Sequence, residues 1–127
     1  MSRPVHFEIH AENPERAIAF YTAMFGWRFE KWEGPWPYWM VYTGEGHGVD
    51  GGLMPRMGGP PVEGAAVNGW VMTVDVPSVD AAVSTGTSSG GSIALPKMEV
   101  PGVGWMAYLK DTEGNIFGVM ESTPAGP

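Results

Sequence analysis

The order of predicted secondary-structure elements indicates an α+β fold built from two βαβββ modules, at about residues 4–54 and 68–121. Three observations predict this fold. The chain begins with a strand, a tight turn and a capped helix, and the second half repeats that order. Between the halves, residues 55–67 are rich in glycine and proline and lack hydrophobic periodicity, which is typical of a linker. The 127 residues are therefore expected to form a single domain of two modules.

The first module is predicted to open with a strand at about residues 4–10, because apolar and polar residues alternate there. A helix is expected at 14–25. Asn13 is a suitable N-cap, Pro14 fits the first helical position, and Gly26 is a typical stop. Further strands are predicted near residues 27–32, 37–43 and 49–54.

The second module is predicted to contain a strand at 68–75 and a helix at 79–88 that Ser78 caps. Residues 85–89 are poor helix formers, so this helix is expected to fray or end early. Strands should follow near residues 92–98, 102–110 and 115–121. The same order of elements thus occurs twice, although the two halves share little sequence identity.

Composition excludes several classes of function. The formal net charge is −7, which opposes binding to nucleic acid or to anionic membranes, since both require a cationic surface. There is no cysteine, so the chain has neither a thiol nucleophile nor a cysteine-ligated metal. No run of about 18 apolar residues and no leader-like segment opens or interrupts the sequence. We therefore expect a cytoplasmic protein with no nucleic-acid or membrane partner.

Two segments near opposite ends of the chain resemble the vicinal oxygen chelate superfamily, which includes glyoxalases, bleomycin-resistance proteins and extradiol dioxygenases. The first contains His6, the helical run 14–22 ending in Phe-Tyr-Thr, and Phe25-Gly26-Trp27. The second is Asp-Thr-Glu-Gly-Asn at 111–115 with the apolar strand after it. The resemblance covers nearly the whole chain. It implies a half-open barrel of paired modules around a cavity, and a homodimer, because family members often dimerise.

The resemblance also implies where a metal would bind. Metal-binding members carry a histidine at the place of His6 and further His or Glu ligands on three other strands. The matching places here are Gly52, the stretch 69–71 and Gly118, none of which offers a ligand. A site made only from His6, Glu8 and His10 would need another strand, because alternate residues on one strand lie about 6.5–7 Å apart. We therefore predict no metal and no cofactor.

His6 and Glu8 are the candidate catalytic residues. They share the non-core face of the first strand. If that face lines an apolar cavity, the Glu8 carboxyl group would have a raised pKa and could exchange protons with a ligand, with His6 as a base or an orienting donor. The alternative is a structural role, in which both side chains bond to each other or to the backbone.

Aromatic and methionine residues supply the second functional signal. The chain has nine methionines and six tryptophans, more than core packing requires, and both side chains suit a pliable apolar pocket. Strand alternation places Tyr38, Met40 and Tyr42 on one face and Trp39 on the other, without indicating which face is inward. The candidate ligand-binding residues are Trp39, Met54, Trp105 and Tyr108.

The leading functional hypothesis is a protein that binds or transforms a small aromatic molecule in a central apolar cavity without a metal. Lyase or isomerase activity is compatible with this hypothesis, and the sequence does not decide whether the protein is an enzyme. One alternative is a metal-dependent enzyme of the glyoxalase or dioxygenase type. A second is a dimeric interaction module without catalysis. Phosphate loops, nucleophile elbows, zinc motifs and dinucleotide fingerprints are absent from the sequence.

Overall fold

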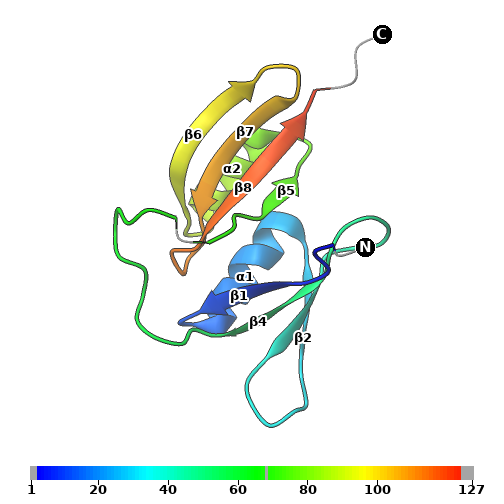
Figure 1. Ribbon diagram of the computed structural model, residues 1–127, viewed down its shortest axis with the longest axis vertical. Helices are drawn as coiled ribbons and strands as arrows, with labels where there is room; N and C mark the ends of the chain where they lie inside the picture. Colours follow the sequence, from blue (N-terminus) through cyan, green and yellow to red (C-terminus); the bar gives the residue numbers. More distant parts are fainter. Residues whose placement is uncertain (1–2, 68, 124–127) are drawn as a thin grey trace. The chain divides into compact units, whose positions relative to one another are not determined.

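The computed structural model describes residues 3–67 and 69–123. The chain separates into two compact units between Pro60 and Pro61, inside the linker predicted from the sequence. Each unit contains one βαβββ module, as Figure 1 shows. The α+β fold class with two such modules is confirmed, and the prediction that both form one domain stays a prediction.

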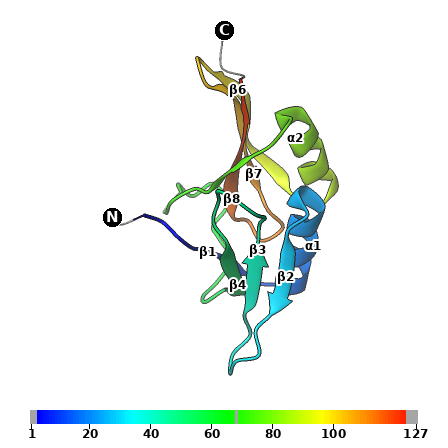
Figure 2. The same cartoon turned by 90° about the vertical axis from the view of Figure 1, so that its right-hand side faces the viewer.

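The first unit consists of β1 (Phe7–Ala11), α1 (Pro14–Phe25), β2 (Arg28–Lys31), β3 (Trp39–Tyr42) and β4 (Gly51–Pro55). Its four strands form one sheet in the order β1-β4-β3-β2. β1 pairs with β4 in parallel, and the other pairs are antiparallel. Figure 2 shows α1 covering one face of this sheet. The first and last strands of the module are therefore neighbours, with β3 on the other side of β4.

The caps predicted from the sequence define the ends of α1. The Asn13 side chain accepts a hydrogen bond from the Arg16 backbone N–H at 3.1 Å. Gly26 ends the helix in the left-handed region at φ 69°, and its N–H donates to the Thr22 carbonyl at 2.9 Å. The helix predicted over residues 14–25 is thus confirmed at both ends.

The core of the first unit lies between the sheet and α1. Ile9, Val41 and Leu53 are buried on three adjacent strands, and Phe20 and Tyr21 are buried on α1. Burying each such side chain stabilises the fold by about 1.5–3 kcal/mol. The alternate residues of the same strands point to the opposite face, which α1 does not cover. That open face carries the polar residues of the first strand.

The second unit repeats this plan with β5 (Thr73–Asp75), α2 (Val79–Ser88), β6 (Ser92–Val100), β7 (Gly104–Lys110) and β8 (Ile116–Ser122). Its sheet has the equivalent order β5-β8-β7-β6, again with a parallel first pair. The residues buried in its core are Val79, Ala107, Leu109, Phe117 and Val119. Among the described residues, no helix is long and apolar enough to cross a membrane.

Two predictions about the second module need correction. The strand expected at 68–75 is shorter, at Thr73–Asp75, although residue 68 lies outside the described part of the chain. The helix does not end early, because it continues to Ser88. The Thr87 and Ser88 hydroxyl groups donate to carbonyls one turn back, at 3.0 and 2.6 Å. At its start, the Glu121 carboxylate accepts from the Val79 N–H at 2.9 Å. α2 packs against β6, β7 and β8, and this tertiary packing outweighs the weak helix propensity.

The side chain of Asp111 holds the turn between β7 and β8. Asp111 is buried, and its Oδ1 accepts hydrogen bonds from the backbone N–H groups of Glu113 and Asn115 at 2.8 and 2.9 Å. Its Oδ2 accepts from the Asn115 side-chain amide at 3.0 Å. The carboxylate thus organises the turn.

Candidate functional site

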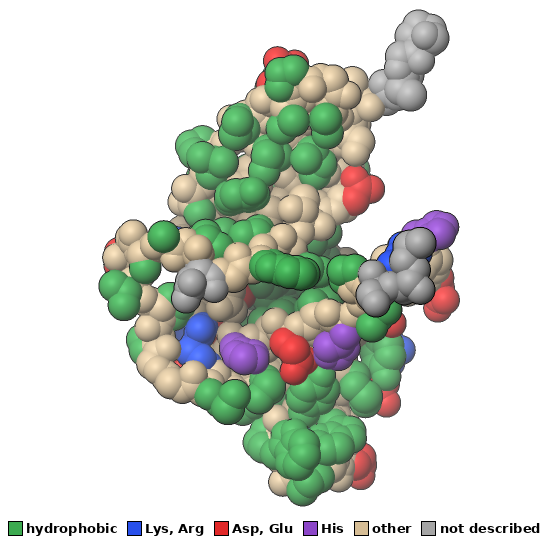
Figure 3. Space-filling model, in the orientation of Figure 1, with side chains coloured by type: hydrophobic (Ala, Val, Ile, Leu, Met, Phe, Trp, Pro, Cys, Tyr) green, Lys and Arg blue, Asp and Glu red, His purple; other side chains and the backbone are tan. Residues whose placement is uncertain are grey.

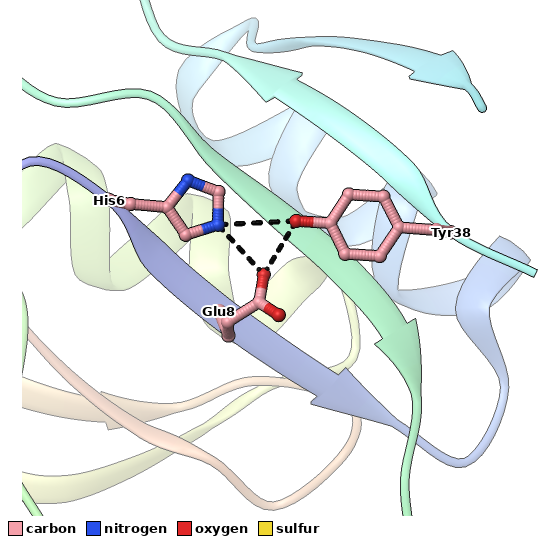
Figure 4. A network of polar contacts seen from close by, with 3 residues as sticks. All are labelled: His6, Glu8 and Tyr38. Carbon is pink, nitrogen blue, oxygen red and sulfur yellow. Dashed lines mark hydrogen bonds and ion pairs between the residues drawn. The ribbon is translucent and has the colours of Figure 1, made fainter. Parts of the chain in front are cut away.

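A three-residue polar network lies on the open face of the first sheet. His6 immediately precedes β1, Glu8 lies within it, and Tyr38 immediately precedes β3. β4 separates these two strands, and Gly52 of β4 is in register with both Glu8 and Met40. Tyr38 therefore reaches over β4 at a glycine to meet Glu8. Figure 4 shows the three polar groups converging at this point.

The distances in this network define where its protons lie. The Tyr38 hydroxyl donates to Glu8 Oε2 at 2.8 Å. The His6 Nε2 atom is 3.0 Å from the same carboxylate oxygen and 3.2 Å from the phenol oxygen. Because the single phenol proton points to Glu8, both contacts of Nε2 are favourable when that nitrogen carries a proton. The arrangement therefore favours the Nε2–H form of His6, which donates to Glu8.

The environment of Tyr38 keeps its hydroxyl protonated. Burial, then the hydrogen bond to Glu8 and the charge of that carboxylate, raise the Tyr38 pKa from 10.0 to about 12. At neutral pH the phenol is therefore a hydrogen-bond donor. The His6 and Glu8 side chains are 49% and 38% exposed, so a ligand arriving from solvent can reach the network.

Gly52 makes the network sterically feasible. A Cβ atom at this position would overlap the phenol oxygen and Cζ of Tyr38, and it would lie 2.6 Å from Glu8 Oε2. The backbone of Gly52 does not have a positive φ, so the requirement concerns space and not conformation. The Tyr38 hydroxyl thus occupies the volume that a side chain at position 52 would fill.

An open aromatic pocket of about 260 Å³ adjoins the network. It is lined by Trp32, Trp36, Tyr38 and Met40, at the hairpin between β2 and β3. The Trp32 and Trp36 ring centroids are 5.0 Å apart with planes tilted by 58°, and Trp32 meets Tyr38 at 6.2 Å and 78°. Figure 3 shows a hydrophobic cluster at this hairpin, at the bottom of the view. Tyr38 belongs to both the pocket and the polar network.

The structure brings together only some of the residues predicted for the site. His6 and Glu8 are in contact, and Met54 lies on the face of Glu8, two residues beyond Gly52 on β4. Trp39 is in register with buried Leu53, which places it on the opposite face, with the Lys31 ammonium 5.7 Å from its ring. A ligand-binding role for Met54 and Trp39 stays a prediction.

Trp105 and Tyr108 belong to the second unit and lie on opposite faces of β7. Trp105 shares its face with buried Ala107, and Lys97 lies 4.8 Å from its ring. Tyr108 is on the other face, in register with Gly118. Their predicted role in binding is likewise untested.

The sequence analysis did not select Tyr38, Trp32 or Trp36 as site residues. The signal for Tyr38 was present, because strand alternation had placed it on one face with Met40. The signal for the tryptophans was the spacing Trp-Glu-Gly-Pro-Trp-Pro-Tyr at 32–38, which concentrates three rings in one hairpin. Gly34 supports that hairpin, since an added Cβ there would overlap the Trp32 ring.

The donor set does not fit the metal site that the family resemblance implies. No cluster of three His, Cys, Asp or Glu side chains suited to a metal ion occurs within residues 3–67 and 69–123. The space at Gly52 is filled by the Tyr38 phenol, and Glu121 on β8 caps α2 through its Oε1. The absence of a bound metal remains a prediction that requires elemental analysis.

Comparison with known proteins identifies the family. The profile of the glyoxalase/bleomycin resistance protein/dioxygenase superfamily matches residues 3–119. This match spans most of the chain, so the protein belongs to that superfamily. The recognition of the family from residues 6–27 and 111–120 is therefore confirmed.

The individual relatives described next share less than 30% sequence identity with this chain. "Putative glyoxylase CFP32" of Mycobacterium bovis is 29% identical over 119 residues, which cover 92% of this chain and 43% of that protein. The chain thus spans less than half the length of this relative. A glyoxylase/bleomycin resistance protein/dioxygenase domain from Frankia sp. EAN1pec superposes with a TM-score of 0.74 at 17% identity, covering 97% of this chain and 99% of that chain. TnmS3, an antibiotic binding protein from Streptomyces sp. CB03234, has a TM-score of 0.70 at 18% identity, covering 97% and 98%. At these identities, both structures show the fold alone.

Proposed function

We propose that this protein binds a small aromatic molecule in the hairpin pocket of its first unit, with the His6–Glu8–Tyr38 network orienting the polar end of that molecule. One observation carries the proposal: Tyr38 lines the pocket with its ring and joins the network with its hydroxyl. A ligand whose apolar body lies in the pocket would therefore have its polar group beside Glu8.

The pocket dimensions favour a small ligand with modest affinity. Its volume of about 260 Å³ lies just below the usual range for drug-sized ligands, which suits a body of one or two rings. Covering about 100 Å² of apolar surface would contribute roughly 2.5 kcal/mol. Each oriented hydrogen bond would add about 1 kcal/mol. These contributions sum to about 4 kcal/mol, which corresponds to a dissociation constant of about 1 mM, and the cost of association makes the expected binding no tighter than this.

The comparisons support this proposal at the level of fold. TnmS3 is an antibiotic binding protein with the same fold, so this architecture accommodates organic ligands in at least that relative. The metal-dependent alternative is less well supported, because the donor set does not fit. The dimeric interaction module would use neither the pocket nor the network, and the following experiment separates it from a binder.

Titration of tryptophan emission with one-ring and two-ring aromatic compounds tests the proposal. We expect saturable changes, because Trp32 and Trp36 line the pocket and Trp36 is 57% exposed. Trp36→Ala should abolish the response. Trp70→Ala is the matched control, because Trp70 is 93% exposed and belongs to the second unit. An unchanged emission across the panel, or an equal response in both variants, would contradict the proposal and favour the interaction module.

A further inference from the structure

The hydrogen-bond donors of the polar network are engaged by acceptors within the network itself. The Tyr38 hydroxyl donates to Glu8 Oε2, and in the Nε2–H form that the geometry favours, His6 donates to the same oxygen and to the phenol oxygen. With a proton on Nε2, the Nδ1 atom of the neutral ring is an acceptor. Within the described part of the chain, no hydrogen bond engages Glu8 Oε1. What the network offers an incoming ligand is therefore a set of acceptors centred on a carboxylate.

The aromatic rings of the hairpin pocket are arranged as a corner, and Tyr38 connects them to Glu8. The planes of Trp32 and Trp36 are tilted by 58°, and those of Trp32 and Tyr38 by 78°. A flat ligand ring can lie face to face against one of these rings and meet the others edge-on, and a cationic group attached to it then lies close to the ring faces. Ring faces attract cations through their quadrupole. Elsewhere in the same unit, Arg28 lies 4.0 Å from the Tyr42 ring centroid.

The charge of the chain acts in the same direction. Its formal net charge is −7, so the long-range field attracts cations and repels anions. An anionic ligand at this site would place its charge next to Glu8 without a free donor to compensate. A protonated amine would instead donate its N–H bonds to Glu8 Oε1 while its apolar body contacts the rings.

We infer that the ligand of this site is an organic cation with N–H donors, in which a protonated amine binds Glu8 and an attached apolar ring occupies the hairpin pocket. The inference rests on the proposed function and specifies its ligand class. It assigns Glu8 as the residue that selects charge, Tyr38 as the residue that holds Glu8 in place, and Trp32 and Trp36 as the contacts of the ligand body.

Four probes of similar size test this inference at neutral pH and low salt: benzylamine, benzyl alcohol, benzoate and benzyltrimethylammonium. Isothermal calorimetry should show that protonated benzylamine binds about tenfold more tightly than benzyl alcohol, the ratio expected for one charge-assisted hydrogen bond. Benzoate should bind most weakly. Benzyltrimethylammonium should be weaker than benzylamine, because it carries the charge without an N–H donor.

Glu8→Gln should reduce the preference for benzylamine over benzyl alcohol to below about threefold, because it removes the charge that pairs with the ammonium group and keeps a side-chain acceptor. Glu12→Gln is the matched control, because it removes the same charge from an exposed position in the same unit and should preserve the preference. An equal loss in both variants would show that net charge alone selects the ligand and would overturn the assignment of Glu8.

The remaining outcomes separate the two proposals. Equal binding of benzylamine and benzyl alcohol to the wild-type protein would overturn the cation inference but leave the aromatic pocket standing. Benzyltrimethylammonium binding as tightly as benzylamine would overturn the role of the N–H donors. If none of the four probes binds, the proposed function itself fails.

Discussion

Replacing Gly52 with alanine should displace the Tyr38 phenol from Glu8. The new Cβ would overlap the phenol oxygen and Cζ, and because Tyr38 is a side chain that can rotate away, the expected response is loss of its hydrogen bond. A bond to a charged acceptor is worth about 1.5–3 kcal/mol when buried. Glu8 is 38% exposed, so we expect about 1 kcal/mol here. The predicted loss from this hydrogen bond alone is therefore about 1 kcal/mol.

A double-mutant cycle isolates this effect from the intrinsic preference for alanine. Alanine in place of a strand glycine favours folding by about 0.5–1 kcal/mol when the site has room. Gly52→Ala should therefore be neutral to destabilising in the wild-type protein and stabilising in a Tyr38→Ala background. The coupling energy between the two substitutions should be about 1 kcal/mol, because the intrinsic preference for alanine is common to both backgrounds and cancels.

Chemical denaturation of the four proteins measures this coupling. Gly59→Ala is a control for the glycine effect, because an added Cβ there would have no heavy atom within 4 Å. If Gly52→Ala has the same effect on the free energy of unfolding with and without the Tyr38 ring, the phenol does not occupy the space at position 52. The proposed construction of the network would then be wrong.

Three further predictions concern protonation, metal content and the β7–β8 turn. Ultraviolet titration against a Tyr38→Phe reference should give a Tyr38 pKa near 12, and Glu8→Gln should lower that pKa. Because folding raises this pKa from 10.0, the protonated phenol contributes stability below pH 10, and this contribution should be lost between about pH 10 and 12. Elemental analysis should find no stoichiometric transition metal; one metal per chain that His6→Ala removes would contradict this. Asp111→Ala should lower the free energy of unfolding by about 3 kcal/mol, because it leaves three donors without their acceptor. The control Asp80→Ala removes an exposed ion pair with Lys97 and should cost less than about 1 kcal/mol. Equal losses of the two variants in chemical denaturation would refute this account.

The fold was predictable because its signals are local. The period-2 pattern at residues 5–10, the cap at Asn13 and the stop at Gly26 each depend on neighbours within a few positions. The second helix was predicted at the correct residues, but its expected early end was wrong, because α2 packs against β6, β7 and β8. Propensity does not register this tertiary packing.

The site was predictable only in part. His6 and Glu8 could be selected because they share one strand face, a property that alternation alone reveals. Tyr38 lies 30 residues from Glu8, and their contact depends on the strand order β1-β4-β3. Gly52 was interpreted only as a place without a metal ligand. The structure shows that the Tyr38 phenol fills the space beside it.

The most direct test of the central claim is to locate a bound probe by NMR. The six tryptophan indole N–H groups should give resolvable signals, and benzylamine should shift those of Trp32 and Trp36 in a saturable manner. The signals of Trp70 and Trp105, in the second unit, should remain unchanged. Saturable shifts at Trp70 or Trp105, with Trp32 and Trp36 unaffected, would place the binding site elsewhere and contradict the account.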